Sequence, residues 1–572
     1  MKIFLPFFKN KRIQTFLAPL FKLIEAVFEL LVPIFVAQII DVGIANNDVK
    51  FILTRCAVLV ALGVGGLGFS VASQYMSASV ATSFAASLRN EAYRKINSLS
   101  FSDVDKQGAE SVITRMTSDV DRLQNGVNMT LRLLLRSPFI VFGAVVGAYL
   151  TDVIGASVFA VVVPVLLVIV FTILLCGMRL YKKSQTELEN VTLLTSENVT
   201  GVRVIRAFGL EEKEKEKFEK QNAAYAKAQL VAGRLSAFMN PLTYAVINCG
   251  VIALLYIGGK RVNAGEMTSG NVVALYNYLS QILVELIKLA NLVITLSRAG
   301  ASGKRVKDLL SLTPSQTFSE KEIQEKETEN VVVFKNVSAR YGGEKCALEN
   351  VNFTLKKGES LGVLGGTGSG KSTLLSLIPR FYDVAEGEVL VDGINVNEYP
   401  KRQLRNKIAV VMQKPFLMSG TIEENVAFGE VNKNKMLSAL NASSSNDVIA
   451  AKKSGLQEKV LRGGSNFSGG QKQRLSLARA LYKDAEILLL DDATSALDAL
   501  TERKVLASVK GLHKTVIATS QRANSLKDFD KILVLDEGKP VAMGTHKELL
   551  ETCPLYKEIY DLQNDDGEAK HE

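Results

Sequence analysis

Residues 365–373, Gly-Gly-Thr-Gly-Ser-Gly-Lys-Ser-Thr, have the composition and spacing of a loop that binds phosphate groups. They fit the pattern G-x-x-x-x-G-K-[ST], whose glycines let backbone N–H groups approach phosphate oxygens. The lysine adds a positive charge near the β- and γ-phosphates, and the hydroxyl that follows can bind Mg²⁺. The residues predicted to bind a nucleotide here are Gly365, Thr367, Gly368, Ser369, Gly370, Lys371, Ser372 and Thr373.

The sequence on either side places this pattern between a strand and a helix. Residues 360–364 form a short apolar stretch with strand character, and residues 374–378 can continue as a helix. Strand, glycine loop and helix N-terminus is the arrangement in which such a loop binds a polyphosphate. A flexible glycine turn is the alternative interpretation, and this context disfavours it.

Three further residues could complete the site. Gln413 ends the apolar run 408–412, where its amide can reach Mg²⁺ or an attacking water, and Asp491 ends the apolar run 487–490. A carboxylate at the end of a strand is the usual Mg²⁺ partner of a phosphate loop, so the predicted metal ligands are Ser372, Gln413 and Asp491. Tyr341 lies near a turn and could stack on an adenine ring, although an aromatic residue there more often serves packing.

These residues lie in the second half of a 572-residue chain, which is too long for a single hydrophobic core. Apolar residues make up 47% of the chain, but the long uncharged runs lie in the first half. A membrane part followed by a soluble α/β part is therefore predicted. The net charge of +10 comes from Lys and Arg beside the apolar runs, as on cytoplasmic flanks, and we do not expect a nucleic-acid partner. The five cysteines and three histidines match no metal or disulfide pattern.

The fold class predicted from these patterns is an N-terminal all-α six-helix transmembrane domain, residues 1–310, followed by an α/β phosphate-loop domain. Outer loops are short and inner segments long, so the helices are expected to continue past the bilayer, with both chain termini in the cytoplasm. Breaks near Ser102 and Gly201 mark the tips of the inner segments, which could dock onto a soluble domain or remain solvated hairpins. The predicted spans are about residues 16–40, 56–78, 133–151, 153–178, 235–259 and 267–297.

Charge and polarity divide the remainder of the chain. Residues 311–330 are predicted to be a linker because they are rich in Glu and Lys. Residues 331–562 then form the nucleotide-binding domain, and residues 563–572 an acidic tail.

Several polar residues fall within the predicted spans, namely Glu25, Glu29, Asn248 and Glu285. Such residues usually face the interior of a helix bundle or a water-filled cavity. Structural pairing with Arg132, Arg136 or Lys288 is the favoured interpretation, and contact with a transported substrate is the alternative.

Over nearly its whole length the chain resembles the ATP-binding cassette (ABC) exporters. The resemblance rests on the six-span half and on the order of the motifs: Tyr341, the loop 365–373, Gln413, the signature Ser468-Gly469-Gly470-Gln471, Asp491, and the segment 495–498. It implies that ATP and Mg²⁺ bind between the phosphate loop of one cassette and the signature of a second, with Ser468, Gly469, Gly470 and Gln471 contacting nucleotide. It also implies that this chain is half of a transporter, and that the tips near Ser102 and Gly201 are coupling helices.

Two positions depart from the family pattern. The catalytic position after Asp491 normally holds Glu and here holds Asp492, and the switch position normally holds His and here holds Gln521. A carboxylate shorter by one methylene is displaced by roughly 1 Å, and an amide has no ionisable imidazole. The three expected catalytic residues are therefore Asp492, Gln521 and Gln413, with slow or no hydrolysis at this chain's own loop.

The resemblance is strongest to the degenerate-site subunits of heterodimeric bacterial multidrug exporters. It implies a partner half-transporter with an intact catalytic Glu and His, a location in the cell membrane with the nucleotide-binding domain in the cytoplasm, and small amphipathic substrates. Two alternatives stay open: a homodimeric lipid or peptide exporter, and a mainly regulatory nucleotide-binding subunit.

Overall fold

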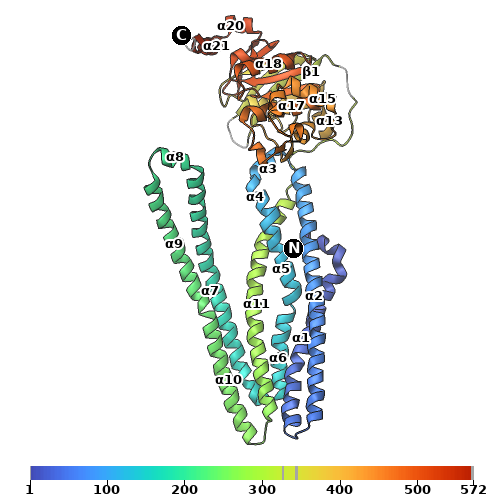
Figure 1. Ribbon diagram of the computed structural model, residues 1–572, viewed down its shortest axis with the longest axis vertical. Helices are drawn as coiled ribbons and strands as arrows, with labels where there is room; N and C mark the ends of the chain where they lie inside the picture. The colour runs from blue at the N-terminus through green and yellow to red at the C-terminus, as the bar shows by residue number, and fades with distance from the viewer. Residues whose placement is uncertain (1, 325–327, 342–345, 569–572) are drawn as a thin grey trace. The chain divides into compact units, whose positions relative to one another are not determined.

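The computed structural model describes residues 2–324, 328–341 and 346–568. The chain forms two compact units (Figure 1). The first contains the residues up to Asn97 together with Ala109–Leu312, and the second contains Ser98–Gly108 together with the residues from Thr313 onward. The chain therefore passes between the units three times, at residues 97–98, 108–109 and 312–313.

The first unit is entirely helical. Long helices lie side by side, and the short helix α8 joins α7 to α9 at one end of the unit (Figure 1). Its elements are η1 (Lys2–Lys11), α1 (Arg12–Gln38), η2 (Ile39–Ile44), α2 (Val49–Ser98), α4 (Ala109–Thr114), η3 (Arg115–Asp119), α5 (Val120–Leu133), α6 (Arg136–Thr151), α7 (Val153–Thr200), α8 (Val202–Ala207), α9 (Glu211–Ala237), α10 (Met239–Asn263) and α11 (Ser269–Leu310).

Six helical segments of the described chain are long and apolar enough to cross a membrane, as predicted. Each runs well beyond its predicted span; α2, for example, has 50 residues. Four apolar side chains along α2 each have 65% of their surface exposed, namely Leu53, Val60, Val64 and Leu67. A helix that faces water would not carry such a row of exposed apolar side chains. Gly143 of α6 packs so closely on α1 that an added Cβ would lie 2.4 Å from Leu30, as expected for helices that associate in lipid.

The charged residues inside these spans form one ion-pair cluster. Arg136 of α6 is 6% exposed, and its guanidinium donates to Glu285 of α11 at 2.6 Å and to Glu29 of α1 at 2.6 Å. Lys288 also donates to Glu285, at 2.7 Å, and Lys22 pairs with Glu25 at 2.5 Å. The prediction of structural pairing is confirmed for Arg136 and Lys288.

Two of the residues considered, Arg132 and Asn248, are not part of these ion pairs. Arg132 makes no ion pair within the described residues, and Asn248 is exposed on α10.

The second unit is built on a six-stranded, mostly parallel sheet in the order β12-β11-β3-β10-β9-β6. An antiparallel four-stranded sheet, β2-β1-β4-β5, and the small pair β7-β8 accompany it. Apolar side chains from both faces of the central strands fill two cores, which explains why β3 and β9 read as continuous apolar runs. The strands are β1 (Asn330–Arg340), β2 (Cys346–Lys356), β3 (Ser360–Leu364), β4 (Glu386–Val391), β5 (Ile394–Asn395), β6 (Ile408–Val411), β7 (Gly420–Thr421), β8 (Lys459–Val460), β9 (Ile487–Asp491), β10 (Thr515–Ser520), β11 (Lys531–Asp536) and β12 (Lys539–Gly544).

Helices cover the sheets, and a separate core around Leu417, Ile422 and Leu475 supports the helices between β6 and β9. The helices of this unit are α3 (Phe101–Gln107), α12 (Lys371–Leu377), α13 (Lys401–Lys407), α14 (Ile422–Ala427), α15 (Lys433–Ala442), α16 (Asn446–Ala450), η4 (Gly455–Gln457), η5 (Arg462–Gly464), α17 (Gly469–Lys483), α18 (Ala499–Lys510), α19 (Ala523–Leu526), α20 (His546–Thr552) and α21 (Pro554–Glu568).

The predicted tail, residues 563–572, starts inside α21. Gln563 accepts a hydrogen bond from the backbone N–H of Ala523 at 2.9 Å and donates to the carbonyl of Gln521 at 2.9 Å. The domain boundary predicted at residue 562 therefore falls inside a packed helix. The acidic composition of the following residues gave no indication of these contacts. Residues 569–572 lie outside the described part of the chain.

The first of the two predicted tips belongs to the second unit. Ser100 caps α3, and its hydroxyl lies 2.7 Å from that of Ser315. The Phe101 ring lies 4.7 Å from the Phe381 ring, and Tyr382 donates to Asp105 at 2.6 Å. The expectation that this tip docks onto the soluble domain is confirmed, and the second tip, α8, lies within the first unit.

Candidate nucleotide-binding site

The order of the parallel strands gathers the predicted site residues at one edge of the sheet. The phosphate loop follows β3, Gln521 follows β10, Asp491 ends β9, and Gln413 follows β6. Because β3, β10, β9 and β6 are neighbours that pair in parallel, their carboxyl ends meet at the same edge. Segments separated by more than 150 residues along the chain thus come together.

The phosphate loop adopts a conformation that requires its glycines. Gly370 has φ +94°, and an added Cβ would lie 2.5 Å from the carbonyl oxygen of Ala347. The Lys371 ammonium donates to the carbonyls of Gly365 at 2.8 Å and Gly366 at 2.6 Å, so its charge lies inside the loop. Helix α12 begins at Lys371, which directs its N-terminal N–H groups towards the same space.

The predicted metal ligands Ser372 and Asp491 are in direct contact. The Ser372 hydroxyl donates to the Asp491 carboxylate at 2.9 Å, and the Thr519 hydroxyl donates to the same carboxylate oxygen at 2.9 Å. Thr519 was not predicted as a site residue. It follows from the sheet order, because β10 lies beside β9 and its register pairs Thr519 with Asp491.

Burial dominates the electrostatics of this group. It raises the pKa of Asp491 above the usual range, against the hydrogen bonds from Ser372 and Thr519, and the neighbouring Asp492 adds to the rise. Burial lowers the pKa of Lys371, and the carboxylates of Asp492 and Asp491 oppose that effect. A cation placed beside Asp491 would stabilise its charged form.

Lowering the pH is expected to weaken Mg²⁺ binding at this site. A raised pKa means that Asp491 is protonated at a higher pH than an ordinary aspartate, and the neutral acid is a poor ligand. Mg²⁺ affinity should be full above the raised pKa and decline as the pH falls through it. A Mg²⁺ titration of a fluorescent ATP analogue, from about pH 8 to about pH 5, measures this.

Asp491→Asn is the matched control for the pH titration. The phosphates of the nucleotide titrate in both proteins, so the difference between the two curves reports the carboxylate alone. Identical pH dependence in the variant and the wild type would contradict a role for Asp491 as a metal ligand.

Asp492 lies immediately after β9 in a left-handed backbone conformation, with φ 47°. Its N–H donates to the Thr519 hydroxyl at 2.9 Å, and its carbonyl accepts from the Ser495 hydroxyl at 2.9 Å. Aspartate adopts this backbone region more readily than most residues. The backbone of Asp492 is thus fixed from both sides, and only the length of its side chain determines how far its carboxylate reaches.

A cavity of about 170 Å³ connects Asp492 with Gln521, and Glu502 and Arg522 also line it. Glu502 is 6% exposed and accepts from Thr494 at 2.6 Å, from Ser525 at 2.7 Å and from Arg522 at 3.3 Å. It therefore ties the segment after β9 to the segment after β10. Sequence reasoning missed Glu502, since its three partners lie 8, 20 and 23 residues away on other segments.

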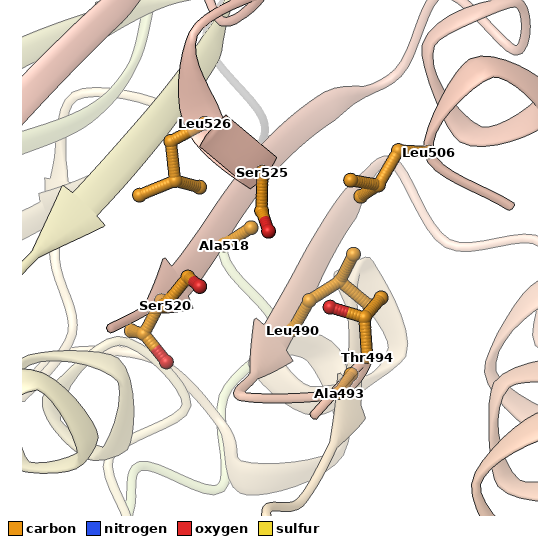
Figure 2. Close-up of a pocket in the computed structure, with 9 residues that line it drawn as sticks. Leu490, Ala493, Thr494, Leu506, Ala518, Ser520, Ser525 and Leu526 are labelled. Atoms are coloured by element: carbon orange, nitrogen blue, oxygen red, sulfur yellow. The ribbon is translucent and has the colours of Figure 1, made fainter. Parts of the chain in front are cut away.

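The wall behind this cavity is closely packed. Leu490 of β9 and Ala518 of β10 lie on neighbouring strands, with Thr494 and Ser525 beside them (Figure 2). The space between these side chains is only about 10 Å³. β9, which ends at Asp491, and β10, which Gln521 follows, are thus closely packed against each other.

The signature residues cap a helix. The Ser468 hydroxyl accepts from the Gln471 N–H at 3.3 Å, and the Gln471 side chain accepts from the Ser468 N–H at 3.0 Å, which is a capping box for α17. Gly469 and Gly470 form the first turn of that helix. Gln473, 2% exposed, donates to the Ser495 hydroxyl at 3.1 Å and accepts from the Ala496 N–H at 3.0 Å, so it fixes the signature helix to the segment 495–498.

The remaining predicted residues lie at the margins of the site. Tyr341 is 48% exposed at the end of β1, with its ring edge-on to Tyr382 at 4.8 Å between centroids. Gln413 is exposed just beyond β6. Thr367 and Gly368 are also exposed, whereas Ser369 and Thr373 are buried.

Two family descriptions match the chain. Residues 15–286 match the ABC transporter transmembrane region, and residues 348–495 match the ABC transporter domain. The chain is 34% identical over 562 residues to an uncharacterized ABC transporter ATP-binding protein, YfiB, of Bacillus subtilis, covering 98% of each. It is 29% identical to the ATP-dependent lipid A-core flippase of Albidiferax ferrireducens, covering 96% of this chain and 95% of the relative.

The fold agrees with a solved structure. The structure of a bacterial Atm1-family ABC exporter with ATP bound superposes with a TM-score of 0.80 at 23% identity, covering 96% of this chain and 98% of the other. The predicted fold class, six apolar helices followed by a nucleotide-binding domain of sheets and helices, is confirmed. The chain is a multi-pass membrane protein and belongs to the ABC transporters, as an exporter-type member with its transmembrane and ATP-binding domains in one polypeptide.

Proposed function

We propose that this chain is the degenerate-site half of a heterodimeric ABC exporter that uses ATP to move small amphipathic compounds across the cell membrane. The observation that carries the proposal is the pair Asp492 and Gln521, which line one cavity at the positions where catalysis would occur. Binding groups such as Lys371, Ser372 and Asp491 surround the same sheet edge. The chain thus has the residues needed to bind ATP, whereas Asp492 and Gln521 are poorly suited to catalysing its hydrolysis.

The roles of the binding residues follow from their placement. The loop 365–373 and the Lys371 ammonium would hold the phosphates, and exposed Tyr341 would stack on the adenine ring. Ser372, Asp491 and Gln413 would hold Mg²⁺, which supplies charge neutralisation of the β- and γ-phosphates when bound. Ser372 and Asp491 already point at each other.

Hydrolysis requires a base that orients the attacking water. Asp492 is one methylene shorter than Glu, so its carboxylate is withdrawn by roughly 1 Å, a displacement that costs on the order of 10²-fold. Gln521 can donate a hydrogen bond to the γ-phosphate but cannot ionise. We infer that both substitutions slow the same step.

A second half-transporter would complete the assembly. ABC exporters work as dimers, and Ser468, Gly469, Gly470 and Gln471 would complete a competent ATP site on the partner, which supplies its own Glu and His. Two exposed apolar side chains on α8 and the loop after it, Val204 at 60% and Phe208 at 75%, are consistent with a surface that another chain covers.

Lipid export is the second candidate function, because one relative that the chain matches over 96% of its length is a lipid A-core flippase. The two functions differ in what stimulates the ATPase. A lipid flippase should respond to one lipid class, and a multidrug exporter to chemically unrelated amphiphiles. The basic flanks of the spans support a cytoplasmic location for both termini and for the nucleotide-binding domain.

The heterodimer predicts unequal effects of two substitutions in this chain. Ser468→Ala should lower the ATPase rate of the purified heterodimer by about 10²-fold, since it removes a donor from the partner's active site. Lys371→Ala should lower it only slightly, because this chain's own loop contributes little turnover. Steady-state ATPase assays of the reconstituted pair measure both.

Ser468 also caps α17, so a matched control is needed for loss of a cap. Thr545→Ala removes the equivalent capping box of α20 and should leave the rate unchanged. If Lys371→Ala lowered the ATPase rate more than Ser468→Ala does, the proposal that the partner's site carries out most of the hydrolysis would be wrong. Mild effects of both would favour a regulatory subunit.

A further inference from the structure

A second cavity, of about 280 Å³, lies within the second unit. It is lined by residues 98–101, by residues between 314 and 318, and by Lys401 and Arg405 of α13. None of these residues belongs to the nucleotide site described above. The cavity is therefore available to a different ligand.

Two cations in its lining have no carboxylate partner among residues 2–324, 328–341 and 346–568. Arg405 donates only to the backbone carbonyls of Pro379 at 3.4 Å and Arg380 at 3.3 Å, and Lys401 makes no side-chain hydrogen bond or ion pair among the residues that the structure describes. Burial lowers the pKa of Lys401 and of Arg405, and each has a second cation nearby that acts in the same direction. Partly buried, unneutralised positive charges are costly unless an anion joins them.

Aromatic rings hold these cations in place. The Arg405 guanidinium lies 5.1 Å from the ring centroid of Phe381, 5.7 Å from Phe318 and 6.0 Å from Phe101. The Lys401 ammonium lies 5.8 Å from the Phe318 centroid. Such contacts fix the position of a cation and leave those N–H groups that are not already hydrogen-bonded free to donate, so little conformational freedom would be lost on binding an anion.

The lining also offers apolar surface, from Leu99 and Pro314. A planar guanidinium beside an ammonium matches the oxygens of a phosphate group, and the volume suits a ligand of a few heavy atoms beyond that phosphate. We propose that this cavity is a binding site for a small phosphomonoester with an apolar substituent, in addition to the ATP site.

Two of the segments that line the cavity lie near points where the chain passes between the two units. Residues 98–101 begin with the last residue of α2, and residues 314–318 follow α11, so both segments lie just after a point where the chain passes from the first unit into the second. Ser100 and Ser315 already join the two segments at 2.7 Å, and Asp103 accepts from the Ser315 N–H at 2.9 Å. A phosphate bound by Lys401 and Arg405 would add a further link between these two segments of the second unit.

Phenyl phosphate is a suitable probe, with benzyl alcohol as its neutral counterpart. We expect saturable binding of phenyl phosphate, and none of benzyl alcohol, by calorimetry of the full-length protein in nanodiscs. Saturating Mg²⁺ and a non-hydrolysable ATP analogue keep the probe out of the phosphate loop. Absence of saturable binding would overturn the proposal.

Substitutions locate the binding site. Lys401→Gln and Arg405→Gln should each weaken binding by about tenfold or more, as expected for loss of a charged hydrogen bond. Arg402→Gln is the matched control, because Arg402 is exposed on the same helix and does not line the cavity. Lys401 packs less closely than Arg405, so its variant keeps the test valid if Arg405→Gln fails to fold. Equal affinity in Lys401→Gln and the wild type would contradict the assignment.

The same phosphate chemistry could come from a soluble ester or from a lipid headgroup. Nanodiscs containing phosphatidic acid, compared with phosphatidylcholine alone, distinguish the sources. Competition by phosphatidic acid would identify a headgroup, and no competition would identify a soluble ester; both results support a phosphate site once the Lys401 effect is seen.

Discussion

Replacing Asp492 by Glu together with Gln521 by His is expected to raise the ATPase rate of the isolated chain by about 10²-fold. The longer carboxylate would regain the reach needed to orient a water, and the imidazole would restore an ionisable group beside the γ-phosphate. Both side chains face the same cavity, so the two changes should act together. Each single change should give a smaller increase.

The local backbone favours this outcome. Thr519 and Ser495 hold the Asp492 backbone from both sides, so a longer side chain extends from a fixed origin. Glutamate adopts a left-handed backbone conformation, such as φ 47° at this position, less readily than aspartate does. The substitution Asp492→Glu should therefore lower the stability of the domain by about 1 kcal/mol without unfolding it.

The control for this experiment is Lys371→Ala added to the double variant. It should abolish the gain, because the gain must arise at this chain's own phosphate loop. A rate unchanged by the Asp492 and Gln521 substitutions would mean that these positions do not limit hydrolysis, and a gain that survives Lys371→Ala would place it elsewhere.

Arg136→Met is expected to destabilise the transmembrane unit by about 3–5 kcal/mol. The substitution leaves Glu285, which is 1% exposed, without the guanidinium that lies 2.6 Å away. Glu29 loses its pairing at 2.6 Å as well. Among the described residues, Glu285 then keeps only Lys288, at 2.7 Å, whose side chain is 40% exposed, so its buried charge is compensated less well, which is costly.

Two variants separate pairing from packing. Lys288→Met should have a small effect, since Lys288 is 40% exposed and Arg136 still neutralises Glu285. Adding Glu285→Gln to Arg136→Met should recover much of the lost stability, because it removes the carboxylate charge that Arg136 no longer neutralises. The chain has no tryptophan, so thermal unfolding is best followed by circular dichroism. No recovery in the double variant would show that Arg136 acts through its shape and not through its charge.

Local pattern was enough to predict the phosphate loop and the six spans. The loop needs a glycine at 370 and a strand before it, and both are visible in a few consecutive residues. The spans follow from long uncharged runs such as residues 56–88. Such features depend on neighbours in sequence, and the structure bears them out.

Features that depend on distant partners were not predictable. The Arg136–Glu285 pair joins residues 149 positions apart, and sequence could offer three basic candidates without choosing among them. In the sequence, Glu502 is an ordinary acidic residue of a helix. Only the structure shows that it accepts hydrogen bonds from Thr494, Ser525 and Arg522. The acidic composition predicted that a tail begins at residue 563, yet Gln563 donates to the backbone carbonyl of Gln521.

The steady-state ATPase rate of this chain, purified alone in lipid, distinguishes a degenerate site from a competent one. We expect a rate far below the roughly 1–100 s⁻¹ typical of phosphoryl-transfer enzymes such as kinases, together with stoichiometric binding of ATP. A rate within that range from the chain alone would show that Asp492 suffices as the catalytic carboxylate, and would contradict a degenerate site.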